Sequence, residues 1–113
     1  MNDTQQSEAY AELIAVQLRK GFLAYCVLRV CSGTAKYTSD IISKLRKADL
    51  VVVEGTIYPL LSRLQKDGLL KHAWQESDQG PPRKYYQTTQ FGDEVAKIVQ
   101  MKIADLNKTL GKL

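Results

Sequence analysis

The side chains of this 113-residue chain best placed for chemistry are two cations beside a proline-rich turn. Arg83 and Lys84 directly follow Gly80-Pro81-Pro82, and further turn formers precede them from Ser77 onward. Prolines limit the freedom of a turn, so both basic groups should be held at one place. A guanidinium beside an ammonium suits a phosphate backbone. We therefore expect nucleic-acid contacts at Gly80, Arg83 and Lys84.

A predicted helix upstream of this turn has apolar residues at the spacing of one helical face, which should be buried. They are Ile57, Leu60, Leu61 and Leu64. On the rest of the surface, Tyr58 and Ser62 are expected to reach base edges. Thr56 and Arg63 should lie nearer the phosphates. The full set of expected contacts on this helix is Gly55, Thr56, Tyr58, Pro59, Ser62, Arg63 and Lys66.

Two residues predict where this helix begins and ends. Pro59 has no amide donor and clashes with the preceding turn, so it is tolerated near a helix N-terminus. The helix should therefore begin between Glu54 and Thr56. Gly68 suits the left-handed conformation that ends many helices.

Two segments around the turn predict strands, because 69–76 is apolar and 83–89 is rich in aromatic and β-branched residues. Tyr85 and Tyr86 must point to opposite faces. One should enter the core and the other should pack on the ribbon, with a phosphate contact as the alternative. Trp74 is expected to pack under the ribbon, and a place in an effector pocket is the alternative.

A helix followed by a two-stranded ribbon with a basic tip is the layout of a winged helix that binds DNA. A first helix is predicted from a cap at Thr38 or Ser39 to about Ala48. It would place Ile41, Ile42 and Leu45 inward. The predicted fold class is therefore mainly α with a small β-ribbon (α+β), a winged helix-turn-helix.

Further helices are expected on both sides of this core. Residues 4–20 predict one helix, Gly21 should interrupt it, and the apolar segment 22–30 predicts a second, buried helix. Residues 32–34 should break that helix. Residues 91–113 predict the last one.

The last helix carries a coiled-coil repeat, with apolar residues spaced by 4, 3, 4 and 3. They are Val99, Ile103, Leu106, Leu110 and Leu113. We expect a homodimer through this stripe, and a stripe folded back on its own domain is the alternative. The chain is interpreted as one domain, 1–113, with a winged core at about 21–89 and a C-terminal dimerisation helix at about 90–113.

Three separated motifs, in order and at plausible spacing, resemble the PadR family of transcriptional regulators. They are EGTIYPLLSRLQKDGLL, GPPRKYYQTT and Phe91-Gly92, with a weaker pattern upstream, so that the resemblance covers roughly residues 21–95. The resemblance implies a winged helix-turn-helix that represses transcription as a homodimer on double-stranded DNA. It also implies small aromatic or other hydrophobic effectors for some members.

Two departures from the family pattern are visible. Val51-Val52-Val53 precede Glu54 where the family often has a small polar cap. Tyr37 and Thr38 stand where the family commonly has tyrosine-glycine, and both are included among the expected DNA contacts.

Charge and composition agree with this interpretation. The net charge is +4, and residues 36–84 carry 9 basic and 6 acidic side chains. No segment approaches the roughly 18 apolar residues of a transmembrane helix, and the polar N-terminus does not have the order of a signal peptide. We therefore expect a cytoplasmic protein without membrane association.

The residue types of the chain do not predict a catalytic site or a metal site. His72 is the only histidine, which excludes a histidine-cluster metal site and makes a catalytic triad unlikely to form. Cys26 and Cys31 are expected to be reduced core thiols, with a redox sensor as the alternative. No enzyme activity, metal or cofactor is expected.

Two functions from different classes remain, a sequence-specific transcriptional regulator and a winged-helix module for protein association without DNA binding. An association module should expose an apolar patch on the recognition helix and ribbon. Polar and basic residues there favour the regulator.

Overall fold

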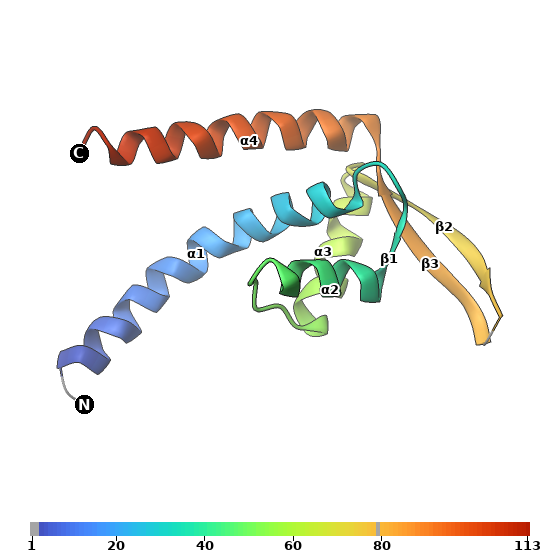
Figure 1. The fold of residues 1–113 in the computed structure, drawn as a ribbon, viewed down its shortest axis with the longest axis horizontal. Helices are drawn as coiled ribbons and strands as arrows, with labels where there is room; N and C mark the ends of the chain where they lie inside the picture. The colour runs from blue at the N-terminus through green and yellow to red at the C-terminus, as the bar shows by residue number, and fades with distance from the viewer. Residues whose placement is uncertain (1–2, 79) are drawn as a thin grey trace.

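The computed structural model describes residues 3–78 and 80–113, a four-helix chain with one small sheet in this part. The elements follow in the order α1 (Asp3–Cys31), β1 (Lys36–Tyr37), α2 (Thr38–Lys47), α3 (Glu54–Lys66), β2 (Leu70–Ser77), β3 (Gly80–Thr88) and α4 (Gln90–Leu110). The predicted α+β class with a winged helix-turn-helix is confirmed. Figure 1 shows α2 and α3 beneath the C-terminal half of α1, with the sheet beside them.

One apolar core joins α1, α2, α3 and the base of the sheet. Both helices of the helix-turn-helix bury the faces that their periodicity predicted, because apolar side chains leave water most completely when they share one face. The buried cluster consists of Val27, Leu28, Cys31, Ile41, Ile42, Leu45, Val52, Ile57, Leu60, Leu61, Leu64, Leu70 and Tyr86. Tyr86 is in the core and Tyr85 is half-buried, as the strand alternation predicted.

The sheet has three antiparallel strands in the order β1-β3-β2, so the prediction of a two-stranded ribbon was incomplete. The added strand, β1, pairs Lys36 with Tyr86 and Tyr37 with Tyr85. Two residues are too few to show a strand periodicity, and their partners lie far along the chain. We call the long β2–β3 ribbon the wing.

The prolines lie within β3, not in the turn between the strands as predicted. Ser77 pairs with Gly80, and the register shifts between Gln75 and Ser77. This irregularity interrupts the ladder beside Pro81 and Pro82, which cannot donate backbone hydrogen bonds. The prolines therefore stiffen a strand, and Gln79 of the predicted connector lies outside the described residues.

Helix α1 is continuous, and the predicted interruption at Gly21 is wrong. A glycine inside a helix costs only about 1 kcal/mol relative to alanine, which the long helix and its buried C-terminal half can offset. The predicted cap of α2 is also wrong. The N-cap is Tyr37, without a side-chain hydrogen bond, and Thr38 is already helical.

The start of α4 is tied to the core by a polar joint. The Thr89 hydroxyl accepts a hydrogen bond from the Gly92 amide at 3.0 Å and donates one to the Gly68 carbonyl at 2.6 Å. The Asp93 carboxylate accepts hydrogen bonds from the hydroxyls of Thr88 (2.7 Å) and Ser32 (3.2 Å). The joint links α4 to both α1 and the sheet.

Gly92 allows the start of α4 to approach the backbone of Leu69 closely. A Cβ atom at this position would lie 2.1 Å from the Leu69 carbonyl oxygen. Only a residue without a side chain permits that approach, so Gly92 sets the distance between α4 and the loop that follows α3.

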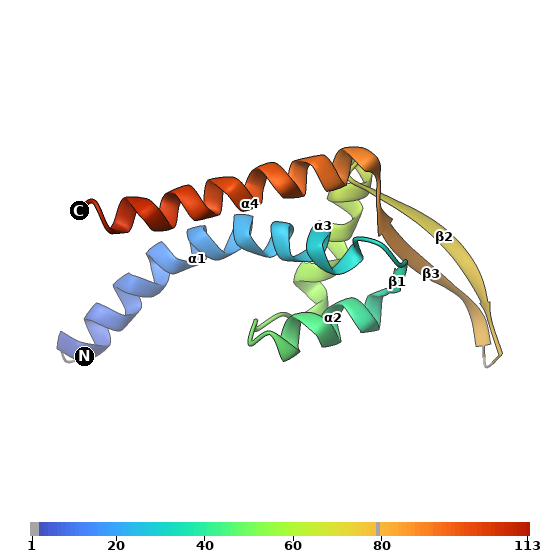
Figure 2. The ribbon, with the colours of Figure 1, turned by 45° about the horizontal axis from the view of Figure 1, so that its top comes forward.

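Two helical segments extend beyond the core, in opposite chain directions and toward the same end of the molecule (Figures 1 and 2). We call them the α1 arm (residues 3–20) and the α4 arm (residues 98–110). Large apolar side chains on both arms are exposed: Tyr10, Leu13, Ile14 and Leu18 on the first, and Ile98, Met101, Leu106 and Leu110 on the second. None of the helices in the described ranges has the length and apolar content needed to span a membrane.

Candidate nucleic-acid interface

The N-terminal end of α3 and the tip of the wing lie on the same side of the molecule, away from α4 (Figures 1 and 2). Helix α3 begins at Glu54, within the predicted range, and Gly68 has a φ of 82°, the left-handed conformation predicted for the residue after the helix. The two predicted contact elements are therefore brought to one surface.

The outer face of α3 is polar and exposed. Ile57, Leu60, Leu61 and Leu64 point into the core. Opposite them, Ser62, Arg63 and Lys66 are exposed, and the Tyr58 side chain is 50% exposed. The remaining predicted positions on this helix, Gly55, Thr56 and Pro59, are exposed as well.

No side chain caps the start of α3. Its N-cap is Val53, whose carbonyl accepts hydrogen bonds from the amides of Thr56 and Ile57 at 3.0 and 3.1 Å. The valines that depart from the family pattern thus leave this helix end without the usual side-chain acceptor. Amides at such an end are suited to a phosphate.

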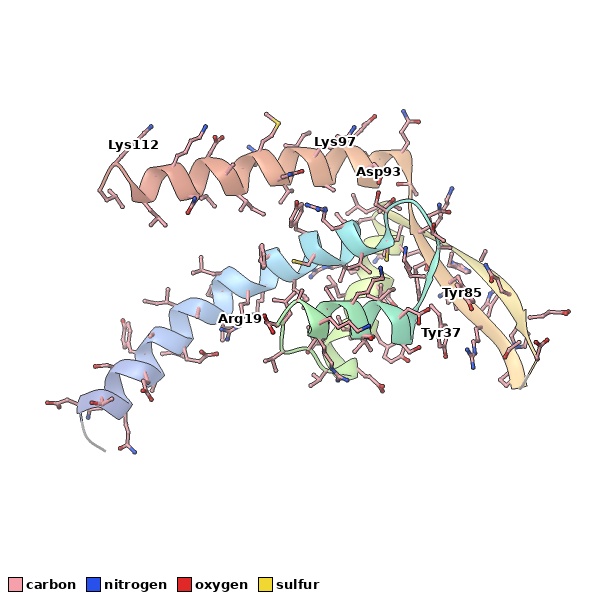
Figure 3. All side chains as sticks on the ribbon, viewed as in Figure 1. Arg19, Tyr37, Tyr85, Asp93, Lys97 and Lys112 are labelled. Carbon is pink, nitrogen blue, oxygen red and sulfur yellow. The ribbon has the colours of Figure 1, made fainter. Side chains whose placement is uncertain are left out.

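Aromatic rings position the two cations of the wing. The Arg83 guanidinium lies over the Tyr37 ring, 5.0 Å from its centroid, and that ring contacts Tyr85 at 5.8 Å. Figure 3 shows Tyr37 and Tyr85 beside each other where α2 meets the sheet. The Lys84 ammonium lies 5.2 Å from the Tyr86 ring centroid. Since successive residues of a strand alternate, one cation is held on each face of β3.

Trp74 does not pack under the wing as predicted. Its side chain is 63% exposed, with the Lys84 ammonium 6.0 Å above its ring and the His72 ring at 6.2 Å. The wing extends past the core, so only its base has apolar neighbours to bury a side chain. His72 is exposed, and its Nδ1 lies 2.6 Å from Gln65 Nε2.

The residues expected to contact DNA at the start of α2 and at the wing tip differ in how far they are exposed to solvent. Thr38 is only 5% exposed, so its hydroxyl cannot reach a ligand in this conformation. Tyr37 is half-buried, and its ring supports Arg83. Gly80 is exposed at the start of β3, with a φ of 131° that favours glycine.

Helix α2 contributes polar groups to which the sequence analysis assigned no role. Arg46 donates a hydrogen bond to the Val52 carbonyl at 3.1 Å and thereby holds the α2–α3 connection. A cavity of about 390 Å³ lies between α2 and the start of α3, lined by Ser39, Ile42, Ser43, Arg46, Lys47 and Glu54. The spacing of Ser39, Ser43 and Lys47 by four residues was the available sequence signal for this shared face.

The predicted dimerisation stripe is only partly covered by its own chain. Val99 and Ile103 are half-buried, whereas Leu106 and Leu110 are 68% and 70% exposed. Helix α4 ends at Leu110, so Leu113 lies beyond the helix and is 95% exposed. The stripe therefore has four helical members, one fewer than predicted.

The two cysteines are free thiols. Cys31 is fully buried, and burial raises the pKa of its thiol to about 12. Burial also raises the pKa of the half-buried Cys26, although the Arg29 charge partly opposes the shift. Because the thiolate is the reactive form, both fit the expected core thiols. Residues 3–78 and 80–113 contain no group of three or more potential metal ligands.

A helix-turn-helix followed by a β-ribbon wing is the architecture of the winged helix-turn-helix class of DNA-binding proteins. Residues 27–98 match the model of the family described as "Transcriptional regulator PadR-like family". The chain belongs to this family. Proteins of this family are DNA-binding transcription regulators and not enzymes.

Solved structures support the assignment. A PadR-like transcription factor from Bacteroides fragilis is 46% identical, with 88% of this chain and 96% of that chain covered and a TM-score of 0.77. A PadR-like transcriptional regulator from Bacillus cereus is 35% identical, covers 85% and 94%, and has a TM-score of 0.75. A PadR family regulator from Eggerthella lenta is 28% identical, covers 96% and 95%, and has a TM-score of 0.83. Comparison with curated proteins gave no significant match.

Proposed function

We propose that this protein is a transcriptional repressor that binds an inverted-repeat operator as a homodimer in the cytoplasm. The observation that carries the proposal is the shared surface of α3 and the wing, where an exposed polar helix face lies beside ring-supported cations. A helix of this kind fits the major groove, and an adjacent wing follows the phosphate backbone.

The two elements have different roles in this proposal. Tyr58 and Ser62 on α3 read base edges, and Arg63 contacts the phosphates. Arg83 and Lys84 hold the backbone from the wing. The rings of Tyr37 and Tyr86 beside these cations reduce the freedom that both long side chains would lose on binding.

The exposed arms support dimerisation. Leu13, Leu18, Leu106 and Leu110 are 67–70% exposed, and a second copy offers the same surfaces for a two-fold interface. Two recognition helices then face half-sites about one helical turn, roughly 34 Å, apart. The two-fold symmetry of such a dimer explains why an inverted repeat is the expected operator.

An association module without DNA binding is the competing function. It would need an apolar patch on the exposed side of α3. Ser62, Arg63 and Lys66 occupy that side instead, which supports the regulator.

A mobility-shift titration tests the proposal, using DNA from upstream of the protein's own gene and an unrelated duplex of equal length as control. We expect a shift at lower protein concentration on the upstream DNA and a steep loss of affinity with added salt, since phosphate contacts release counterions. Equal affinity for both duplexes, or a complex insensitive to salt, would contradict it.

A further inference from the structure

Trp74 is a large apolar side chain of the wing to which the proposed function assigns no role. It is the only tryptophan of the chain, and its side chain is 63% exposed. It lies within β2, opposite Lys84 of β3, and the ladder ends toward the tip at the pair of Ser77 and Gly80. A single exposed apolar residue is ordinary on protein surfaces, so what surrounds the ring decides whether a partner is expected.

The ring lies on the side of the wing that faces α3. Alternate residues of a strand share a face, so Trp74 shares its face with His72. Across the ladder these two residues pair with Lys84 and Tyr86, which lie on the same face. Tyr86 is buried in the core at the base of the wing, and His72 Nδ1 lies 2.6 Å from Gln65 Nε2 on α3. Trp74 is therefore the next ring of a face that begins in the core and continues outward along the wing.

The surroundings of the ring are positively charged. The Lys84 ammonium lies near two rings, 6.0 Å from the centroid of Trp74 and 5.2 Å from that of Tyr86. Within the described residues, this ammonium forms no ion pair with a carboxylate. Strands β2 and β3 carry three lysine or arginine side chains and one carboxylate: Lys71, Arg83, Lys84 and Glu76. An exposed ring beside an unneutralised cation fits a partner that offers an apolar surface next to a negative charge.

The sugar–phosphate backbone of DNA has both features, since the apolar C–H groups of each deoxyribose lie beside a phosphate. We propose that Trp74 packs against a deoxyribose of one backbone strand while Lys84 contacts the adjoining phosphate. This inference rests on the proposed function and adds a nonionic contact to the ionic contacts of the wing. The strand concerned passes between α3 and the wing, because both side chains lie on the face turned toward α3. Arg83, on the opposite face, contacts a different part of the backbone.

Two other partners fit the position of Trp74 less well. A side chain that enters the base stack must unstack a base step, and a residue at the tip is best placed to do so. Trp74 is set back from the tip by the pairs that include Gln75 and Ser77. The core of a protein interface is depleted of charged residues, whereas the neighbours of Trp74 are His72 and Lys84. Contact with the backbone is therefore favoured over both.

Tryptophan fluorescence tests the contact directly, because Trp74 is the only tryptophan. Acrylamide should quench the emission of the free protein readily, since the ring is exposed to water. Addition of the upstream duplex should shift the emission to shorter wavelength and lower the quenching constant at least about twofold, because the sugar covers the ring. A strongly quenched emission without a shift would place the ring on a base and overturn the deoxyribose contact. Unchanged acrylamide quenching would leave the ring in solvent and overturn any contact.

Titration of variants measures what the ring contributes to affinity. Trp74→Ala should weaken binding to every duplex by about tenfold, because apolar surface is no longer covered. The salt slope should not change, since no ionic contact is lost. Trp74→Phe keeps an aromatic ring and should lose only about threefold.

Phe91→Ala is the matched control. It removes an aromatic side chain that is 54% exposed on α4, the helix that lies away from the α3 end and the wing tip (Figures 1 and 2). Its affinity for DNA should equal that of the wild type. Retention of the wild-type melting transition shows that each variant is folded.

A purely supporting role for the ring predicts a different result. If Trp74 only held Lys84 in place, Trp74→Ala would lower the salt slope by about one unit, as Lys84→Ala does. The double variant would then bind no more weakly than Lys84→Ala. The deoxyribose contact instead predicts that Trp74→Ala still weakens binding several-fold when Lys84 is already alanine.

The outcomes separate this inference from the proposed function. A Trp74→Ala variant that binds the operator as tightly as the wild type would refute the ring contact and leave the regulator standing. A wild type that binds every duplex equally, with its ring still protected, would refute the sequence-specific regulator and leave the contact standing. Absence of binding to any duplex would refute both.

Discussion

The winged core and the two arms differ in how far their large apolar side chains are buried. In the core, Ile57 and Leu61 of α3 are 0% exposed. On the arms, Leu18 and Leu110 are each 70% exposed. The core therefore buries its apolar side chains with contacts from one chain, whereas the arms leave large apolar side chains exposed.

Helix α1 belongs to both regions, so the same helix has a buried end and an exposed end. Its Val27 and Cys31 are completely buried, while Leu13, only four turns earlier, is 67% exposed. Covering one such leucine is worth roughly 1.5–3 kcal/mol. A continuous helix thus joins a domain with a buried core to a surface whose large apolar side chains are mostly exposed.

The largest expected effect comes from disrupting association through the α4 arm. Ile103→Glu with Leu106→Glu places two charges in the apolar stripe, and unpaired buried charge is costly. We expect light scattering to show a monomer where the wild type is a dimer. Operator affinity should fall by about 100-fold or more, because the second half-site no longer adds to binding.

A matched control adds the same two charges beside the stripe. Ala104 and Asn107 are exposed and have the same spacing, so Ala104→Glu with Asn107→Glu should remain dimeric and keep its operator affinity. A wild-type protein that stays monomeric at high concentration would refute the dimer, as would a folded stripe variant that stays dimeric.

Gly92→Ala tests the joint between the regions. The added methyl group would overlap the Leu69 carbonyl, and overpacking of this kind costs typically 1–3 kcal/mol. Thermal unfolding should therefore occur at a lower temperature. Gly21→Ala is the control, since nothing lies within 4 Å of the added atom, and it should stabilise the protein by up to about 1 kcal/mol. Equal melting temperatures for the two variants would show that the joint is not tight.

Substitutions on the wing test whether the winged core contacts the phosphate backbone of DNA. Arg83→Ala with Lys84→Ala should weaken binding to every duplex and reduce the salt slope by up to about two units, because two phosphate contacts are lost. Lys108→Ala with Lys112→Ala removes equal charge near the C-terminus, which Figure 3 shows far from the wing. That control should keep the wild-type slope. If the wing variant also keeps it, the wing does not contact phosphate.

The smallest effect is expected on the face of α3. Ser62→Ala should reduce discrimination between the operator and a mismatched duplex by about 1 kcal/mol, the low end for a base contact. Tyr58→Phe should act in the same direction and less strongly. Competition titrations with both duplexes measure the difference, and Thr34→Ala removes a hydroxyl from an exposed loop as the control. If both α3 variants discriminate between the two duplexes as well as the wild type does, residues other than Ser62 and Tyr58 contact the bases.

Predictions from local patterns succeeded where neighbours in sequence decide the structure. The buried faces of α2 and α3, the end of α3 at Gly68 and the opposed faces of Tyr85 and Tyr86 all follow from helical or strand periodicity and from glycine's backbone freedom. The interruption predicted at Gly21 failed because a local cost was weighed without the helix around it. Trp74 was misplaced because the length of the wing beyond the core is not a local property.

The sequence by itself determined the class of the fold, the polar face of the recognition helix and the basic wing, since each depends on residue type at short spacing. Only the tertiary structure decided which distant segments meet. It paired Tyr37 with Tyr85 beneath Arg83, joined Asp93 to Ser32, and placed Lys20 and Arg63 in the lining of one cavity. The physical reason is that these contacts depend on how whole elements pack, and packing is set by the summed burial of many side chains rather than by any one motif.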